Sequence, residues 1–216
     1  MMEKKELIDI IDQILGAFKK NKIDALFIES RQAALQSILE RIPLGATVGA
    51  GDSVTLEEIG IFKELKRRKF TLYWPFDEEV PKEERRNIAK KALLADVFLS
   101  GANAITVDGK IVNADATGNR VAGMIFGPKK AIIAVGTNKI VKNLDEALER
   151  IRNVAAPLNA RRIREKRGWE LLPCVKIGRC VDCNAENRIC NITTIIEKKP
   201  RAIDITVIIV GENLGL

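Results

Sequence analysis

The sequence predicts an α/β fold in which a mostly parallel β-sheet carries helices on both faces. Short apolar segments alternate with longer amphipathic ones between residues 24 and 136, and this order is typical of strand–helix–strand units. Segments such as 131–135 are apolar at every position, which fits strands that are buried on both faces of a parallel sheet. A chain of 216 residues can build one sizeable core, so we expect a single domain over 1–216.

The first half of the chain gives clear local patterns. Apolar side chains recur at helical spacing in residues 3–20, and Pro81 suits the first turn of a helix. The expected elements are a helix over 3–20, a strand over 23–28, a helix over 30–41, a strand over 46–51, helices over 54–60 and 61–69, a strand over 70–74 and a helix over 81–94.

The second half contains a β-hairpin insertion and a cysteine loop. Asp108-Gly109 lies between two apolar segments and predicts a hairpin with a tight primed turn, which needs positive φ at both central residues. Asn143, with Glu146 three residues on, marks a helix start, and Pro157 marks a break. The expected elements are a strand over 97–101, the hairpin over 104–112, a helix over 119–126, a strand over 131–135, a helix over 143–155, a helical piece over 159–167, the cysteine loop over 170–192, and strands over 192–196 and 203–210.

Composition limits the class of protein. Hydrophobic content of 46% and charged content of 30% are those of a soluble globular protein, and no apolar run is long enough to span a bilayer. The N-terminal segment lacks the features of a signal peptide, so we expect a cytoplasmic protein. The net charge of +7 is spread over short groups and aromatic residues make up only 5%, so nucleic-acid binding is not expected. Histidine is absent, which leaves carboxylates, lysine, cysteine or a bound cofactor for any chemistry.

Two polar segments are candidates for a ligand site. Residues 49–53 (GAGDS) join a short strand to a helix, where glycines let a ligand approach the backbone and free amides attract anions. Residues 113–120 (NADATGNR) form a polar loop between the hairpin and an apolar helix. Helix capping explains many of the same residue types, including Ser53, Glu58 and Thr117.

All four cysteines fall in one segment, with the spacing C-x5-C-x2-C-x6-C. A Cys-x-x-Cys pair and two flanking cysteines can complete a tetrahedral metal site, so we expect zinc or an iron–sulfur cluster here. Local disulfides or neighbouring buried thiols remain the alternatives. The proposed metal ligands are Cys174, Cys180, Cys183 and Cys190.

Taken together, these motifs resemble the lactate-utilisation (LUD) domain family. The resemblance rests on GAGDSVTLEEIG at 49–60, SGANAIT at 100–106, NADATGNRVA at 113–122 and GPKK at 127–130, and it covers residues from about 20 to the end. The cysteine segment resembles a branch of the family that stands alone as a single domain. The resemblance implies a fold like ribose-5-phosphate isomerase, glucosamine-6-phosphate deaminase and the CoA transferases.

The resemblance also implies a role in oxidising L-lactate to pyruvate with a multi-subunit iron–sulfur system. We therefore expect a pocket for a small anionic ligand, such as lactate or another carboxylate or phosphate compound, in which Arg120 pairs with the anion. A non-catalytic binding or assembly subunit and a sugar-phosphate isomerase-like enzyme are the alternatives. By fold analogy alone, Glu58 and Asp115 are candidate catalytic carboxylates. The expected ligand-binding residues are Gly49, Gly51, Asp52, Ser53, Asn103, Gly118, Asn119 and Arg120.

Overall fold

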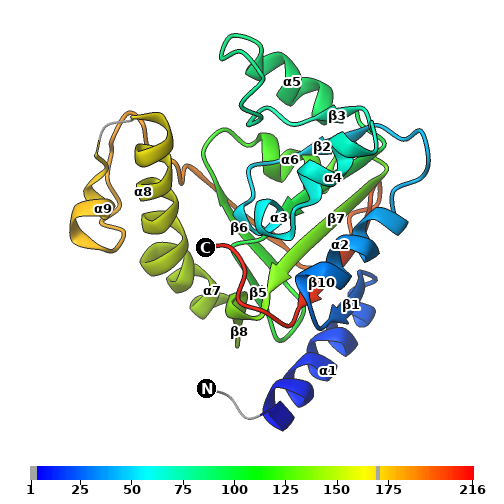
Figure 1. Cartoon of the computed structure of the whole chain (residues 1–216). Helices are drawn as coiled ribbons and strands as arrows, with labels where there is room; N and C mark the ends of the chain where they lie inside the picture. The colour runs from blue at the N-terminus through cyan, green and yellow to red at the C-terminus, as the bar shows by residue number, and fades with distance from the viewer. Residues whose placement is uncertain (1–3, 169–170) are drawn as a thin grey trace.

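Six parallel strands form the central sheet of the computed structural model, which describes residues 4–168 and 171–216 (Figure 1). Their order is β1-β10-β7-β4-β2-β3, so the last strand of the chain lies between the first and the seventh. The predicted α/β class with a mostly parallel sheet is confirmed. The strands are β1 (Asp24–Ile28), β2 (Val48–Ala50), β3 (Leu72–Tyr73), β4 (Val97–Gly101), β7 (Lys130–Gly136) and β10 (Asp204–Val210).

Helices cover one face of this sheet. Alternate side chains of β7, Ile132 and Ala134, are fully buried there because successive residues of a strand point to opposite faces. They pack with apolar side chains of three helices that follow β1 and β2 along the chain. These helices are α2 (Arg31–Glu40), α3 (Val54–Ile59) and α4 (Ile61–Arg67).

The opposite face carries further helices and a second sheet. The other side chains of β7, including Ile133 and Val135, pack there with Ile14 and Phe18 of the amphipathic helix α1 (Lys4–Lys20). The predicted placement of helices on both faces is therefore confirmed. Two further helices contribute Ala92 and Met124 to this core: they are α5 (Arg85–Ala92) and α6 (Asn119–Ile125).

The predicted hairpin belongs to a second, four-stranded sheet rather than to an isolated insertion. The order is β8-β5-β6-β9, in which β6 pairs antiparallel with both β5 and β9. Sequence periodicity does not reveal this pairing, because β9 lies about 80 residues beyond β6 along the chain. The strands are β5 (Ala104–Thr106), β6 (Ile111–Asp115), β8 (Ile140–Val141) and β9 (Ile192–Ile196).

The hairpin turn differs from the predicted primed turn. Gly109 has φ +79°, but Asp108 is not among the non-glycine residues with positive φ in the described chain. Thr106 N–H donates to Lys110 O at 3.0 Å, and Gly109 N–H donates to Thr106 O at 2.9 Å. These bonds define a loop of three residues ending in a left-handed glycine. Asn21, the residue directly after α1, donates to the carbonyl oxygens of Asp108 and Gly109 and so fixes this loop against the end of the first helix.

The predicted helix break at Pro157 is wrong. The chain runs from α7 (Leu144–Arg150) through a π-helical turn (Ile151–Ala155) into α8 (Ala156–Arg167). Pro157 lies in the first turn of α8, where its missing N–H costs least. The wider π turn just before it interrupts the regular α-helical hydrogen bonds. By contrast, the Asn143 cap is as predicted, since its side chain accepts from Glu146 N–H at 3.0 Å.

The remaining predicted elements are present with adjusted ends. The main difference is α5, which begins at Arg85 rather than at Pro81, because residues 82–84 form turns before it. Within the described residues no helix is long and apolar enough to cross a membrane. Cytoplasmic localisation and single-domain organisation stay predictions.

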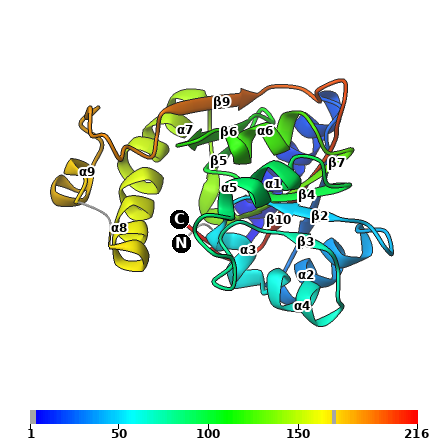
Figure 2. The ribbon, with the colours of Figure 1, turned by 90° about the horizontal axis from the view of Figure 1, so that it is seen from above.

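The cysteine segment forms a small module beside α8. A short helix, α9 (Pro173–Ile177), packs on α8, and a cluster of five buried residues joins the two. Figures 1 and 2 show α8 and α9 at the side of the sheet, and Figure 2 shows β9 running from this module across the body. The buried residues of the module are Ala160, Ile163, Leu172, Cys174 and Ile189.

Candidate functional site

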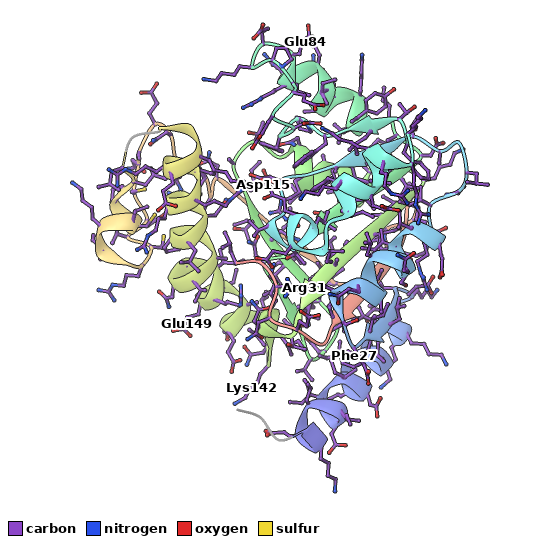
Figure 3. The ribbon with its side chains drawn as sticks, viewed as in Figure 1. Phe27, Arg31, Glu84, Asp115, Lys142 and Glu149 are labelled. Carbon is purple, nitrogen blue, oxygen red and sulfur yellow. The ribbon has the colours of Figure 1, made fainter. Side chains whose placement is uncertain are left out.

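A cavity of about 170 Å³ opens outside the carboxyl ends of β2, β4 and β7. This is the usual ligand position in open parallel sheets, since loops from neighbouring strands converge there. Figure 3 labels Asp115, one of the lining residues, between α8 and the central sheet. The polar and charged lining residues are Asp52, Ser53, Asn103, Asp115, Thr117, Asn119, Arg120, Lys139, Asn159 and Arg162.

Helix α8 forms the wall opposite the sheet. Arg162 on α8 donates to Asp52 at 2.5 Å and to Asn159 at 3.0 Å, so its guanidinium ties the helix to the loop after β2. Lys166, one turn further on, lies 3.3 Å from Glu57 of α3. These ion pairs hold α8 across the cavity.

Arg120 is the centre of the polar loop that the sequence singles out. Its Nη1 donates to Asn113 Oδ1 at 2.6 Å and to Gly101 O at 3.2 Å, while its Nη2 donates to Ala114 O at 2.7 Å. Nη2 also lies 3.3 Å from Asn103 Oδ1. All of these acceptors belong to β4, β6 and the segment between β4 and β5. The guanidinium therefore braces three segments, although its side chain also lines the cavity.

Asp115 completes this bracing. Its Oδ2 lies 3.3 Å from Arg120 Nε, and both side chains are nearly buried, at 8% and 12% exposure. Its Oδ1 accepts from the backbone N–H groups of Thr117 and Gly118 at 3.1 and 3.0 Å. These three contacts fix the turn before α6. They leave the carboxylate fully engaged by neighbouring donors, which favours a positioning role over proton transfer.

The glycines of the 49–53 segment serve close packing rather than lining the cavity. A Cβ at Gly49 would collide with the carbonyl oxygen of Ala92 in α5. A Cβ at Gly51 would lie 2.5 Å from Arg120 Cγ, so glycine here makes room for the bracing arginine. Neither residue is among those that line the cavity within the described chain. Asp52 and Ser53, by contrast, do line it.

Several other expected residues do come together. Asn103, Asn119 and Arg120 all line the cavity, and Asn103 Oδ1 also accepts from Ala114 N–H at 2.9 Å. Gly118 is not among the described residues that line the cavity; with φ +91° it instead provides the left-handed turn into α6. Ser53 caps α3 by accepting from Leu56 N–H at 3.3 Å, so the helix-capping role that the sequence offers as an alternative for Ser53 is present.

Glu58 lies apart from the cavity lining. Its carboxylate is exposed and accepts from Gly215 N–H at 2.7 Å. The nearby polar group that does line the cavity is Lys139, in the 3₁₀ turn (Thr137–Lys139) that directly follows β7. Sequence reasoning missed Lys139, although its position just after a buried parallel strand was a usable signal.

Lys139 is a buried lysine with an unusual pKa. The residue is only 5% exposed, and its Nζ donates to Thr55 Oγ1 at 2.8 Å. Burial, together with the positive charges of Arg150 and Arg120, lowers the pKa of Lys139 to about 7, while the negative charge of Glu58 acts in the opposite direction. A lysine of this kind is partly neutral near pH 7 and can act as a base or a nucleophile.

The pKa of Lys139 predicts how its replacement changes stability with pH. Between about 7 and 10.5 the unfolded chain keeps this proton while the folded protein has lost it, so folding becomes more favourable as the pH rises. This contribution is lost as the pH falls towards 7. Relative to Lys139→Met, the wild type should gain about 2 kcal/mol of unfolding free energy between pH 7 and 9. Chemical denaturation at both pH values measures it, with Lys142→Met as the exposed control; an unchanged difference would contradict the buried, neutral lysine.

The cysteine module holds four thiols without disulfide bonds. Burial raises the pKa of Cys174, and the other three cysteines raise it further, so the four sulfur groups influence one another. Arg188 donates to Cys183 O at 2.7 Å and pairs with Asp182 at 2.9 Å. In residues 4–168 and 171–216, however, no three His, Cys, Asp or Glu side chains are arranged to hold a metal ion. Four thiols are a suitable set of ligands for a four-thiolate centre, but in this arrangement they do not converge on one point.

The cysteine module contacts the cavity directly. Ile189 of the cysteine segment lines it, and Asn191 N–H donates to Asp115 O at 2.9 Å. Asn191 Nδ2 also donates to Ala116 O at 3.2 Å. The strand pair β6–β9 then begins at Asp115 and Ile192, two residues beyond Cys190. The end of the cysteine segment is thus part of the wall around Asp115.

The fold and the site define an α/β protein with a small polar cavity at the carboxyl edge of a parallel sheet, flanked by a cysteine module. The model of the LUD domain family matches residues 11–210, and the chain belongs to this family, which is implicated in lactate utilisation. The sequence-based family prediction is therefore confirmed.

Among solved structures, the chain is similar to the crystal structure of a DUF162 family protein from Deinococcus radiodurans at 1.70 Å resolution. The two share 13% sequence identity with a TM-score of 0.56, over 94% of this chain and 97% of that one. This likeness supports the fold. No curated protein matches the chain. The expected likeness to the isomerase, deaminase and transferase folds stays a prediction.

Proposed function

We propose that this LUD-domain protein binds a small carboxylate of the lactate and pyruvate class in the cavity beside Arg120 and Lys139, as a component of L-lactate oxidation. The observation that carries the proposal is the charge of the lining. Three cationic side chains, Arg120, Lys139 and Arg162, line the cavity together with two acidic ones, Asp52 and Asp115. Asp115 pairs with Arg120 and Asp52 pairs with Arg162, so the charge left to attract an anion is that of protonated Lys139, a form that a bound carboxylate would itself stabilise.

The hydrogen-bond partners of the three cationic side chains indicate different roles for them. The side-chain N–H groups of Arg120 and Arg162 donate hydrogen bonds to protein acceptors. These two arginines therefore contribute positive charge and fix the shape of the cavity wall. Lys139 has three N–H donors when protonated, and within the described residues its hydrogen-bond partner is Thr55. Together with the amide of Asn119, it is the side chain best able to offer hydrogen bonds to a ligand.

The cavity volume favours a small carboxylate over a sugar phosphate. A volume of about 170 Å³ is roughly five to six times the share of one water molecule in the liquid. It falls below the roughly 300 Å³ at which pockets for larger ligands begin. Lactate and pyruvate, with six non-hydrogen atoms each, are of the matching size.

Replacing Arg162 tests the binding proposal. Arg162→Met removes one positive charge and leaves Asp52 in the wall without this partner, so the affinity for pyruvate and L-lactate should fall about tenfold or more. Calorimetric titration measures it. Arg161→Met is the matched control, because Arg161 is the exposed neighbour on α8 and does not line the cavity. Equal affinities in the two variants, or tight binding of ribose 5-phosphate instead, would refute the proposal.

We also propose that the four cysteines hold zinc or an iron–sulfur cluster. The presence of four cysteine thiols in one small module supports this proposal. Metal binding would bring these sulfur atoms, which already influence one another electrostatically, into coordination of one centre. An iron–sulfur centre would supply electron transfer, and partner redox subunits would then be expected. Zinc would stabilise the module alone. Lactate-dependent reduction of an artificial electron acceptor by the purified protein distinguishes a redox component from a binding subunit without turnover.

A further inference from the structure

Lys139 stands at the corner where the central sheet meets the cavity. It ends the 3₁₀ turn after β7, the strand that lies between β10 and β4. Thr137 N–H donates to Glu212 O at 3.0 Å, and Asn138 Oδ1 accepts from Leu214 N–H at 3.1 Å. Both bonds run to the C-terminal segment, and Arg150 Nε of α7 donates to Asn138 O at 3.1 Å, so the turn is held by two other parts of the chain.

The surroundings of Lys139 are not those of a structural ion pair. Its hydrogen-bond partner in the described part of the chain is the hydroxyl of Thr55, which is itself fully buried. The acidic side chain that opposes the lowering of its pKa is Glu58, whose carboxylate accepts a hydrogen bond from Gly215 N–H. Arg150 and Arg120 add positive charge from α7 and α6. A charged ammonium is disfavoured here by burial and by both arginines.

The chain leaves little freedom around the amine. A Cβ at Gly215, which has φ +67°, would collide with Thr55 Oγ1 and lie 2.9 Å from Lys139 Nζ. Glycine at this position lets the backbone pass close beside the lysine. Lys139 is itself one of the residues that line the cavity.

We propose that Lys139 is an amine nucleophile that forms an imine with a 2-oxo acid bound in this cavity. This inference rests on the proposed function and deepens it, because it names the ligand class as one that carries a carbonyl group beside its carboxylate. A buried lysine that is partly neutral near pH 7 has a free electron pair for this reaction, whereas an exposed lysine is almost entirely protonated.

The chemical step needs no oxidant or reductant. The electron pair of Nζ attacks the carbonyl carbon and forms a C–N bond, while the carbonyl π electrons move to oxygen, which takes up a proton. The carbon–oxygen bond of this carbinolamine then breaks as the nitrogen electron pair forms C=N. Both protons of the neutral amine leave with that oxygen as water, so amine and carbonyl give imine and water.

Reductive trapping tests the inference on the full-length protein. Pyruvate is added with sodium cyanoborohydride, which reduces an imine to a stable secondary amine, and the labelled residue is located by peptide mass spectrometry. At pH 7 a lysine with a pKa of about 7 has a neutral fraction roughly a thousandfold larger than an ordinary lysine. We expect labelling of Lys139 to exceed that of the exposed Lys142 by about tenfold or more, with part of the advantage lost to restricted access.

The controls separate this inference from the proposed function. Lys142→Arg should keep the label and Lys139→Arg should lose it, while mapping of the wild type makes the result independent of variant folding. A second arm uses propanal, which has a carbonyl group but no charge. Pyruvate that binds in a titration but does not label Lys139 overturns the imine and leaves the binding proposal intact. Labelling by propanal without binding or labelling by pyruvate overturns the carboxylate site and the 2-oxo acid assignment. Failure of both reagents to label Lys139 above Lys142 overturns the nucleophile outright.

Discussion

Replacing Arg120 with alanine should lower the free energy of unfolding by about 3–5 kcal/mol, because it leaves the buried Asp115 without its charged partner. The loss extends beyond one ion pair. The guanidinium also donates to Asn113 Oδ1, Gly101 O and Ala114 O, and each of these acceptors would lose this charged donor in a nearly buried environment. For a chain of this length, the melting temperature should fall by about 10 °C or more.

A conservative variant and an exposed control make this result specific. Arg120→Lys keeps the charge but lacks the planar fork that reaches acceptors on β4 and β6, so it should recover only part of the stability. Arg86→Ala, on the exposed side of α5, should melt like the wild type. Thermal unfolding with and without pyruvate measures all three. An Arg120→Ala protein that melts normally but no longer binds pyruvate would restore the sequence-based interpretation of Arg120 as the anion partner.

Replacing Cys180 or Cys183 with serine should abolish metal binding and expose the cysteine module to proteolysis. Among the described residues the core of the module has five buried side chains, which is a small apolar core to hold it firmly. Metal binding supplies folding free energy in modules of this size. Anaerobically purified wild type should contain about one metal centre per chain, as zinc or as iron with sulfide, and the serine variants should lose it.

The control for this experiment lies in the same loop. Asn184→Ser changes an exposed side chain beside Cys183 and should keep both the metal and the resistance to protease. Elemental analysis, the absorption spectrum and limited proteolysis give the readout. Wild-type protein that is free of metal, with two disulfides after anaerobic and reducing preparation, would exclude the metal centre.

The local elements of this chain were predictable because their signals lie close together in sequence. Alternation of apolar segments gives the order of strands and helices, and the Asn143 cap marks the start of α7. The partners of distant strands were not predictable in this way. The pairing of β9 with β6 depends on contacts between segments far apart along the chain, and the tolerance of Pro157 depends on a π turn just before it.

The candidate site, too, was predictable where the signals are local and not where they depend on contacts between distant segments. The polar segments at 49–53 and 113–120 do converge, as expected for loops after neighbouring parallel strands. Residue type alone does not predict what each side chain does there, because an arginine in a polar loop can bind a ligand or can hydrogen-bond the protein's own backbone. Gly51 gives the clearest example, since the atom it makes room for is Cγ of Arg120. Arg162 reaches the cavity from α8, and no local pattern predicts that approach.

The position of a bound carboxylate tests the central claim most directly. A crystal structure of the protein with saturating pyruvate measures it, and cyanoborohydride treatment of the same crystals preserves any covalent adduct. We expect pyruvate in the cavity between Lys139, Asn119 and Arg162, with its carboxylate against this positive wall. Pyruvate bound elsewhere on the protein, with only water in this cavity, would contradict the claim.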